Sequence, residues 1–326
     1  MLNFGVIGAG RIARTFCDAV RNNQGNLYAI ASRSIEKATD YKNTYGFEKA
    51  YDSYEALLND EKVECVYIST PHGLHYEHMM LALQHNKPIL CEKAFTLNAQ
   101  QAEEIFALAK EKKLFVMEAM WTRFLPITKT LQTLLNDGII GDIKILEADF
   151  CFKANIDLND RLYNPALGAG ALLDIGIYPI NYANIFLGEP TSFKSTCEYT
   201  QTGVDAAETI TYEYPTSIAK LSASLNYDKP RLAKIYGSKG FIHVPNFWAS
   251  ETATIYTLDG DVIKTLNLPH KVNGFEYQIE ETIRCIKEGL LESKFMPHAT
   301  TISILKQMDE LRNAWNIQYP QEKKGA

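Results

Sequence analysis

A glycine-rich motif near the start of the chain is the first feature whose residue types could do chemistry. Residues 8–13 follow the pattern GxGxxA. In a strand–turn–helix unit, the first glycine permits a tight turn, the second lets the backbone approach a pyrophosphate, and the small third residue lets helix and strand pack closely. Amide groups at the helix N-terminus then face the phosphates. The residues expected to contact a dinucleotide at this turn are Gly8, Gly10, Arg11 and Ile12.

The residues after the second expected strand indicate which dinucleotide would bind. An NAD site usually places an acidic residue about 20 positions beyond the glycines, where it binds the ribose hydroxyls. No acidic residue occurs between Asp18 and Glu36, and residues 32–34 read Ser-Arg-Ser. Because an arginine can bind a 2′-phosphate with two hydrogen bonds and stack on adenine, we predict NADP rather than NAD. A solvated surface arginine is the alternative. The predicted phosphate contacts are Ser32, Arg33 and Lys37.

Three later segments that follow expected strands also carry polar or aromatic residues. They are residues 69–75, 91–94 and 118–124. In an open parallel sheet, ligands bind beyond the carboxyl ends of the strands, so these segments should lie at one edge. The further residues expected to contact the cofactor are Thr70, Pro71, His72, His75, Glu92, Lys93, Trp121 and Arg123.

Three histidines in this region raise the alternative of a metal site. His72, His75 and His78 are spaced three residues apart. A zinc-peptidase helix instead pairs two histidines four residues apart with a glutamate beside the first. Because that pairing is missing, we predict no metal and place His75 at a helix start beside the cofactor.

A second glycine-rich segment, residues 168–179, begins a helix in the later half of the chain. Asp174 and Tyr178 lie four residues apart in it, and residues at that spacing share one face of an α-helix. A tyrosine on an apolar helix face is often a packed core residue, and a lysine at a strand end can simply be solvated. The residue types alone leave a catalytic and a structural interpretation open for Lys93 and Tyr178.

The first 120 residues contain an alternation of elements that could position these groups. Short apolar runs alternate with helical patterns, and in residues 98–112 Asn98 can cap the helix with Gln101 three residues later. Strands that alternate with helices indicate βαβ units and a parallel sheet covered on both faces. The expected strands are residues 2–7, 27–31, 49–51, 65–69, 88–91 and 114–117.

The pattern changes beyond residue 124, where strands follow one another with few helices between them. This is typical of a largely antiparallel sheet with helices on one face. We therefore expect an α/β protein with an N-terminal Rossmann dinucleotide-binding domain at 1–123 and a C-terminal α+β domain at 124–326, built on a large, mostly antiparallel open sheet. The expected strands of the second domain are residues 143–152, 191–200, 208–214, 218–225, 232–236, 241–244, 252–257 and 262–266.

Composition excludes several classes of protein. The chain has 326 residues, of which 46% are hydrophobic, and a formal net charge of −6, which argues against a general nucleic-acid binder. No stretch reaches the roughly 18 apolar residues of a membrane-spanning helix, and the first residues lack the basic region of a signal peptide. Six scattered cysteines without a CxxC pair indicate free thiols in a reducing cytoplasm.

The chain resembles the glucose–fructose oxidoreductase/inositol dehydrogenase (Gfo/Idh/MocA) family, and within it the branch of dimeric dihydrodiol and NADP-dependent D-xylose dehydrogenases. The likeness runs from the glycine motif to residues 319–323 and is strongest at residues 117–124 and 170–178. Two positions depart from the family pattern. Ala94 replaces the usual proline after the lysine, and His72 stands where asparagine is common.

The resemblance implies three catalytic residues, Lys93, Tyr178 and Asp174. Lys93 looks like the family's active-site lysine, Asp174 like the acid that begins its DxxxH motif, and Tyr178 stands where many members carry a catalytic histidine. An alcohol that gives up a hydride must also lose a proton, and an ammonium group near a tyrosine favours the phenolate that would accept it. Asp174 could hold Lys93 in place. Arg161 looks like a second-domain residue that reaches the cofactor.

The leading hypothesis is an NADP-dependent dehydrogenase acting on the CH–OH group of a sugar, such as an aldose oxidised at C1, or of a cyclic vicinal diol. A non-catalytic NADP-binding regulator is an alternative from another class. It is disfavoured because a regulator could have lost Lys93, Asp174 or Tyr178 without penalty, yet all three are present. A carbonyl reductase working in the reverse direction is a third. An open sheet face and the resemblance both imply a homodimer or higher homo-oligomer.

Overall fold

Short strands alternate with helices through the first part of the chain, as the sequence pattern predicts. In the computed structural model, which describes residues 1–23 and 25–325, six of these strands form one parallel sheet in the order β3-β2-β1-β4-β5-β6. This order reverses beside β1, which is the arrangement of a doubly wound dinucleotide-binding fold. The strands are β1 (Leu2–Ile7), β2 (Gly25–Ala31), β3 (Lys49–Tyr51), β4 (Cys65–Ile68), β5 (Ile89–Glu92) and β6 (Val116–Ala119).

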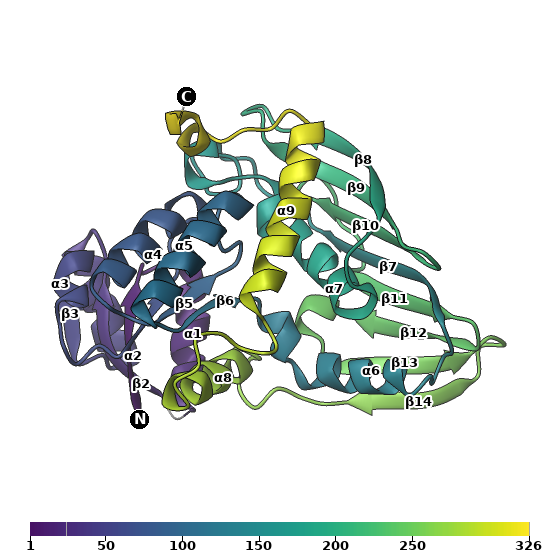
Figure 1. Cartoon of the computed structure of the whole chain (residues 1–326), viewed down its shortest axis with the longest axis horizontal. Helices are drawn as coiled ribbons and strands as arrows, with labels where there is room; N and C mark the ends of the chain where they lie inside the picture. Colours follow the sequence, from purple (N-terminus) through teal and green to yellow (C-terminus); the bar gives the residue numbers. More distant parts are fainter. Residues whose placement is uncertain (24, 326) are drawn as a thin grey trace. The chain divides into compact units, whose positions relative to one another are not determined.

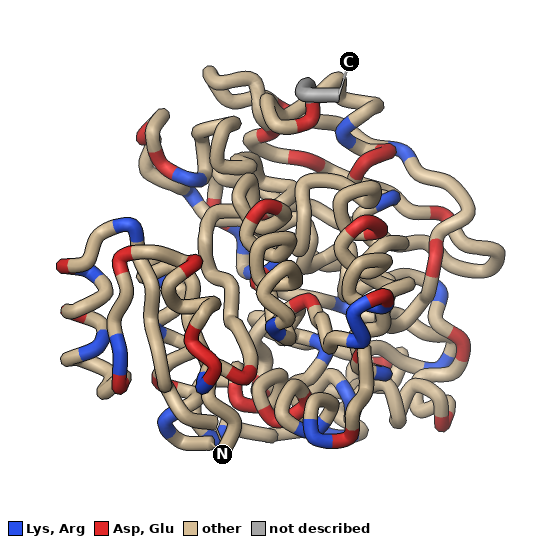
Figure 2. Tube along the Cα trace, turned by 60° about the vertical axis from the view of Figure 1, so that its left-hand side comes forward, with Lys and Arg blue, Asp and Glu red and all other residues tan. Residues whose placement is uncertain are grey.

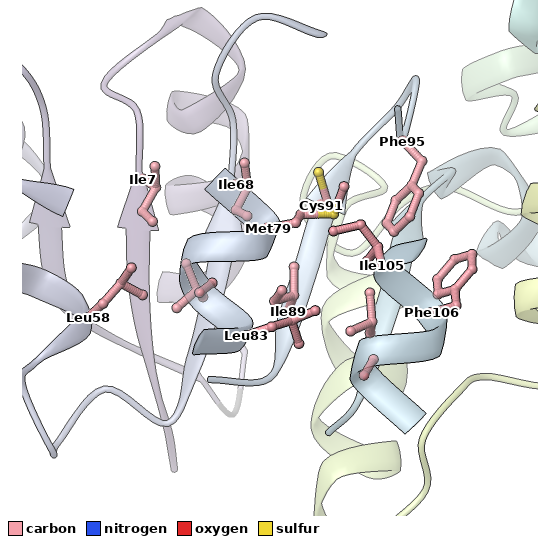
Figure 3. Close-up of a cluster of buried hydrophobic side chains, with 14 of the residues drawn as sticks. Ile7, Leu58, Ile68, Met79, Leu83, Ile89, Cys91, Phe95, Ile105 and Phe106 are labelled. Atoms are coloured by element: carbon pink, nitrogen blue, oxygen red, sulfur yellow. The ribbon is translucent and has the colours of Figure 1, made fainter. Parts of the chain in front are cut away.

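Helices cover both faces of this parallel sheet (Figure 1). On one face, apolar side chains of α4 and α5 pack over β4 and β5, where Met79, Leu83 and Ile105 are fully buried (Figure 3). This burial of one stripe from each helix gives the amphipathic pattern in the sequence its physical reason. The helices are α1 (Arg11–Arg21), α2 (Ile35–Tyr45), α3 (Tyr54–Leu58), α4 (His75–Gln84), after the short turn η1 (His72–Leu74), and α5 (Ala99–Lys112).

The predicted cap of α5 is confirmed. Oδ1 of Asn98 accepts a hydrogen bond from the amide of Gln101 at 2.9 Å. The side chain of Gln101 reaches back to the amide of Leu97 at 3.1 Å, one residue earlier than in a standard capping box. Two amide groups at the start of α5 are therefore bonded by side chains.

The second sheet is mostly antiparallel, as expected. Within the described residues eight strands pair in the order β14-β13-β12-β11-β7-β10-β9-β8, and only β7 and β10 run parallel. Leu146, Ala148 and Phe150 of β7 point to the buried face of the sheet, while Glu147 and Asp149 point to the other. The strands are β7 (Ile143–Cys151), β8 (Ser192–Tyr199), β9 (Asp205–Glu213), β10 (Ile218–Ser224), β11 (Leu232–Gly237), β12 (Gly240–Pro245), β13 (Thr252–Thr257) and β14 (Val262–Asn267).

The helix expected at residues 171–187 has two parts. Leu172–Gly176 is a π-helical turn, η4, and the α-helix α7 (Ile177–Leu187) follows it. Both lie against β7 and β10 on the buried face of the sheet (Figure 1). π-Helical turns inside α-helices are frequent at functional sites. The other helices after residue 120 are η2 (Trp121–Phe124), α6 (Pro126–Asn136), η3 (Pro165–Leu167), η5 (Phe247–Ala249), α8 (Glu276–Lys287), α9 (His298–Ala314) and η6 (Pro320–Gly325).

The described residues form two compact units whose limits differ from the expected division at residue 123. The first unit is Met1–Trp121 with Lys271–Leu305, and the second is Thr122–His270 with the segment from Lys306 onward. The segment with α8 joins the first unit because Asn273 donates to the carbonyl of Thr15 at 2.9 Å and Asn23 donates to the carbonyl of Glu276 at 3.1 Å. Such contacts, about 250 residues apart in sequence, leave no local signal.

The charged residues match the mildly acidic composition. Lysine and arginine are interspersed with aspartate and glutamate along the chain (Figure 2). None of the helices in the described part is both long enough and apolar enough to cross a membrane.

Candidate active site

The turn between β1 and α1 is a backbone cradle that fits a pyrophosphate. Gly8 has a φ of +102°, and a Cβ atom there would lie 3.2 Å from the carbonyl carbon and oxygen of Ser69. Gly10 caps α1 and has no side chain that could bond to the first amide groups of the helix. The hydroxyl of Tyr41 donates to the carbonyl of Gly10 at 2.8 Å and steadies the turn. The structure places Arg11, exposed, and Ile12, half-buried, at the start of α1.

The residues after β2 offer an exposed cation and a capped helix start. Arg33 is exposed and makes no hydrogen bond or ion pair with any residue that the structure describes. The hydroxyl of Ser34 accepts from the amide of Lys37 at 3.2 Å, and that of Ser32 accepts from the amide of Ser34 at 3.3 Å. The guanidinium of Arg33 is thus available to an anionic ligand.

His78 lies near Arg33, although the predicted contacts did not include it. Its Nδ1 lies 2.9 Å from Oγ1 of Thr70, and its ring meets that of Tyr54 edge-on at 4.8 Å. Burial, helped by the charge of Arg33, lowers the pKa of His78 to about 4. The ring is therefore neutral at pH 7 and adds no positive charge beside Arg33. Pro71 and His72 continue the same loop after β4, with Pro71 half-buried and His72 buried.

The two charged residues at the end of β5 have different surroundings. Glu92 is 4% exposed, and its Oε1 accepts from the hydroxyl of Tyr67 at 2.6 Å, so its carboxylate belongs to the interior. Lys93 is half-buried. The Lys93–Ala94 peptide bond is cis even though alanine replaces the proline of the family pattern.

Two further residues predicted at the cofactor are buried. His75 is 0% exposed, and its ring nitrogens lie 2.8 Å from the carbonyl oxygen of Ala94 and 2.7 Å from that of Thr70. Both nitrogens therefore face backbone carbonyl oxygens, which leaves neither of them open to a ligand. Trp121 is 8% exposed and packs on Phe275 with ring centroids 5.0 Å apart.

The second unit brings Asp174, Tyr178 and Arg161 together. Nη1 of Arg161 donates to Oδ1 of Asp174 at 2.7 Å; the Asp174 side chain is 9% exposed and that of Arg161 45%. Burial works against the charge of Arg161, but Asp174, with smaller contributions from Asp160 and Tyr178, raises the pKa of the guanidinium. Arg161 thus acts electrostatically on both residues. Asp174 lies in the π-helical turn η4 and Tyr178 in α7, so the two residues are not on the face of one regular α-helix as the sequence led us to expect.

Arg123 also has a role within the second unit. Its Nε donates to Oδ1 of Asn181 at 2.5 Å, and its Nη2 donates to Oδ1 of Asn184 at 2.6 Å. Both asparagines lie on α7, the helix that carries Tyr178. The guanidinium predicted to contact the cofactor is therefore engaged with this helix.

Aromatic residues beside Tyr178 escaped the sequence analysis. The ring of Phe150 lies 5.5 Å from that of Tyr178 and stacks on Trp248 at 4.2 Å. The alternation of β7 could have placed Phe150 on the buried face, but Trp248, in the short turn η5, carries no periodic signal. Tyr178 itself is 7% exposed.

Two buried acids of β9 lie behind the π-helical turn. Oδ2 of Asp205 accepts from the amide of Leu172 at 2.5 Å, and burial raises the pKa of Asp205 to about 6. Glu208 is 2% exposed, neither of its oxygens has a hydrogen-bond partner in the described structure, and burial raises its pKa well above the ordinary value. Gly176 has no Cβ, and one there would collide with Glu208. Glycine at this position therefore permits the close approach.

Metal-ligating side chains do not gather in the described part of either unit. No group of three or more histidines, cysteines, aspartates or glutamates that could hold an ion occurs among the residues described. His75 and His78 are both engaged with neighbours on loops of the first unit.

The glycine cradle, the parallel sheet and the second sheet together define a dinucleotide-binding protein with a separate α+β unit. A family model described as "oxidoreductase family, NAD-binding Rossmann fold" (Gfo/Idh/MocA) matches residues 2–120, and the C-terminal domain model of the same family matches residues 128–243. The chain belongs to this oxidoreductase family. The predicted family, fold class and enzyme class are thereby confirmed.

The matches to known relatives and solved structures extend over nearly the whole chain. Trans-1,2-dihydrobenzene-1,2-diol dehydrogenase of Xenopus laevis is 33% identical over 97% of this chain and 99% of its own; the Homo sapiens enzyme is 29% identical over 99% of each. A 3-ketoreductase from Actinomadura kijaniata, solved with NADP and TDP-benzene, superposes with a TM-score of 0.88 at 26% identity, covering 96% of this chain and 97% of that one. An aldose–aldose oxidoreductase from Caulobacter crescentus shares the fold, with a TM-score of 0.86 at 21% identity over 97% of each.

Proposed function

We propose that this protein is an NADP-dependent dehydrogenase that oxidises a CH–OH group of a cyclic vicinal diol or of a pyranose sugar. The observation that carries the proposal is the setting of Tyr178. Its phenol lies beside the ring of Phe150 and within the electrostatic influence of Arg161, which is itself paired with Asp174. A phenol near a cation is a suitable acceptor for the proton of an alcohol.

The first unit supplies the cofactor site in this proposal. Gly8, Gly10 and the uncapped start of α1 would hold the pyrophosphate, with Arg11 and Ile12 beside it. Arg33, with Ser32 and Lys37, would bind the 2′-phosphate that distinguishes NADP from NAD. The ketoreductase solved with NADP supports this choice. Thr70, Pro71, His72, Lys93 and Trp121 follow strand ends and remain proposed contacts.

The chemistry needs one proton acceptor and one cation. When bound, the nicotinamide accepts the hydride that leaves the alcohol carbon. Tyr178, as phenolate, takes the hydroxyl proton, and a carbonyl product remains. We assign Lys93 the task of favouring the phenolate and orienting the reacting oxygen, and Asp174 with Arg161 the task of holding the charge around Tyr178.

The aromatic neighbours of Tyr178 favour a ring-shaped substrate. Phe150 and Trp248 stack at 4.2 Å, and the ring of Phe150 lies 5.5 Å from that of Tyr178, so the surroundings of the phenol are aromatic. The faces of a cyclic diol or a pyranose present CH groups that pack on such rings. The names of the diol dehydrogenase relatives agree with the first of these substrate classes.

Turnover measurements test the proposal directly. Purified protein is mixed with cyclic vicinal diols, pentoses, hexoses and inositols, each with NADP+ and with NAD+, and reduced cofactor is followed by absorbance. We expect turnover with NADP+ on at least one diol or sugar. A regulator would instead bind NADP+ tightly and show no turnover. That absence of turnover would hold both for the alcohols with NADP+ and for carbonyl compounds with NADPH in the reverse direction.

We also propose a homodimer formed through the open face of the second sheet. Half-buried aromatic residues gather there: Phe241 stacks on Tyr256 at 4.9 Å, with Tyr236 and His243 beside them. Next to them lies a shallow polar hollow lined by residues such as Glu147 and Lys220. A surface with an aromatic centre and charged surroundings suits a second copy of the chain. The division at residue 123 into a cofactor domain and a substrate and dimerisation domain belongs to this proposal, as does a role in carbohydrate metabolism.

A cytoplasmic location is the last part of the proposal. The six cysteines are free thiols in the described chain, and five of them are buried. Free thiols of this kind suit a reducing compartment.

A further inference from the structure

The turn that presents Lys93 is held by two buried polar side chains. The peptide group next to the Lys93–Ala94 bond joins Ala94 to Phe95. Its carbonyl oxygen lies 2.8 Å from Nδ1 of His75, and its amide donates to Oε1 of Glu118 at 3.2 Å. His75 is 0% exposed and Glu118 is 1% exposed. One peptide group is thus held at both its oxygen and its nitrogen.

Each of these two side chains has a second partner in the same unit. Nε2 of His75 lies 2.7 Å from the carbonyl oxygen of Thr70, and Oε2 of Glu118 accepts from the hydroxyl of Thr301 at 3.0 Å. The loop after β4, the turn after β5, the end of β6 and the start of α9 are therefore joined through one peptide group. A side chain held by two partners has little freedom to move.

The side chain of Phe95 adds an apolar anchor. Its ring is 0% exposed and stacks on Phe106 of α5 with centroids 4.8 Å apart (Figure 3). Phe106 stacks in turn on His298 at 3.9 Å. The residues on one side of Lys93 are thus fixed in the core, whereas Lys93 itself remains half-buried.

We propose that His75 and Glu118 are positioning residues for Lys93, which act by fixing the Ala94–Phe95 peptide group. The proposal rests on the function proposed above only in assigning Lys93 a role in turnover. Glu118 accepts from the amide continuously. A neutral imidazole has one N–H group, so His75 donates to one of its two carbonyl partners at a time. Replacement of Glu118 should therefore have the larger effect.

The direct test measures the reactivity of Lys93 rather than turnover. Each lysine is acetylated with a trace of acetic anhydride, and the rate at Lys93 is read by peptide mass spectrometry. In Glu118→Leu, which leaves the Phe95 amide without its acceptor, we expect that rate to change by about threefold or more because the turn loosens. Glu118→Gln keeps an acceptor and should restore it. Tyr28→Phe, which removes a buried hydroxyl bonded to Asp60 elsewhere in the unit, is the matched control.

Turnover provides the second readout. Loss of positioning should lower kcat by about 10- to 100-fold, as removal of supporting hydrogen bonds and small displacements typically do. The KM for NADP+ should change by less than about threefold, because Lys93 is one of several proposed cofactor contacts and the glycine turn and Arg33 are untouched. If the wild-type protein turns over no substrate, the proposed function fails while the acetylation test still decides the role of Glu118.

Unchanged Lys93 acetylation in a folded Glu118→Leu protein overturns the proposal. If Glu118→Leu does not fold, Thr301→Val is used, because it removes only the hydroxyl that donates to Glu118. An unchanged acetylation rate of Lys93 in Thr301→Val would also overturn the proposal. A change in Tyr28→Phe equal to that in Glu118→Leu would also overturn it, because a general loss of stability would then explain both.

Discussion

Arg161 donates a hydrogen bond to Asp174 at 2.7 Å, and the same guanidinium acts electrostatically on Tyr178. The sequence led us to expect Asp174 as a partner for Lys93 and Arg161 as a cofactor contact. Within the second unit, Asp174 holds a cation near the proposed proton acceptor, and its pairing with Lys93 stays a prediction. The environment of Tyr178 therefore contains a positive charge that belongs to its own unit.

The first prediction concerns this ion pair. Arg161→Met should lower kcat by about tenfold, because loss of about one pKa unit of phenolate stabilisation corresponds to that factor. The Arg161 side chain is 45% exposed, so the cost in stability should stay under about 1 kcal/mol. Thermal unfolding and steady-state kinetics measure the two effects. Arg161→Lys, which keeps the charge, is the matched variant. Equal kcat in Arg161→Met and the wild type would remove Arg161 from the mechanism.

The second prediction concerns the proton acceptor. Tyr178→Phe removes only the hydroxyl and should lower kcat by about 10²- to 10⁴-fold with NADP+ binding nearly unchanged. Lys93→Met should have a similar effect, and the double variant should be little worse than either one, because groups that act as a unit are not additive. If Tyr178→Phe retains most of the wild-type turnover, Lys93 rather than Tyr178 is the general base.

The pH profile of oxidation tests the same pair independently. A free tyrosine has a pKa of about 10. A nearby ammonium favours the phenolate, so the wild-type rate should rise with pH through an apparent pKa below that value. Lys93→Met should move this limb upward or abolish it. Identical pH–rate profiles for the wild type and Lys93→Met would show that Lys93 takes no part in the proton transfer.

The third prediction concerns cofactor choice. Arg33→Ala should raise the KM for NADP+ by about 10- to 100-fold, which corresponds to the loss of a charge-assisted contact of about 1.5–3 kcal/mol. The KM for NAD+ should change little because it lacks the 2′-phosphate. Lys62→Ala, another exposed cation of the same unit, is the control. Tighter binding of NAD+ than of NADP+ by the wild-type protein would contradict this assignment.

The fourth prediction uses the raised pKa of the buried Glu208 carboxyl. Its folded pKa lies well above the unfolded one, so its contribution to stability is fully present below the unfolded pKa, near 4.3, and is lost as pH rises towards the folded pKa. Glu208→Gln has nearly the same shape and does not ionise. The melting temperature of this variant, relative to wild type, should therefore rise from pH 4.5 to pH 8. A constant difference would mean that Glu208 has a bonded partner.

The last prediction concerns assembly. Sedimentation at micromolar concentration should show a homodimer or a larger homo-oligomer. Phe241→Asp places a charge in the aromatic centre of the open sheet face and should shift the protein towards monomer without loss of fold. Lys62→Ala, in the other unit, should leave the distribution unchanged. A wild-type protein that sediments only as monomer would end this part of the proposal.

Much of the fold followed from local patterns. Strands β1, β3 and β13 have the bounds that the apolar runs predict, and Asn98 caps α5 as its spacing from Gln101 indicates. These signals are local because strand and helix periods and caps depend on residues within a few positions of each other. The glycine turn and the Ser-Arg-Ser segment at residues 32–34 were readable for the same reason.

The partners of individual side chains depended on the tertiary structure. Glu92 ends β5 and His75 begins α4, both next to the predicted cofactor contacts, yet the structure shows that both are bonded within the core. Asp205 reaches Leu172 across 33 positions of sequence. Residue type and spacing by themselves determined a dinucleotide-binding fold and the location of its strand-end loops, and the resemblance of the sequence to a known family added the oxidoreductase class. Only the packing of distant segments decided which polar groups of those loops stay available, because a buried group must find its hydrogen-bond partner wherever the chain folds against it.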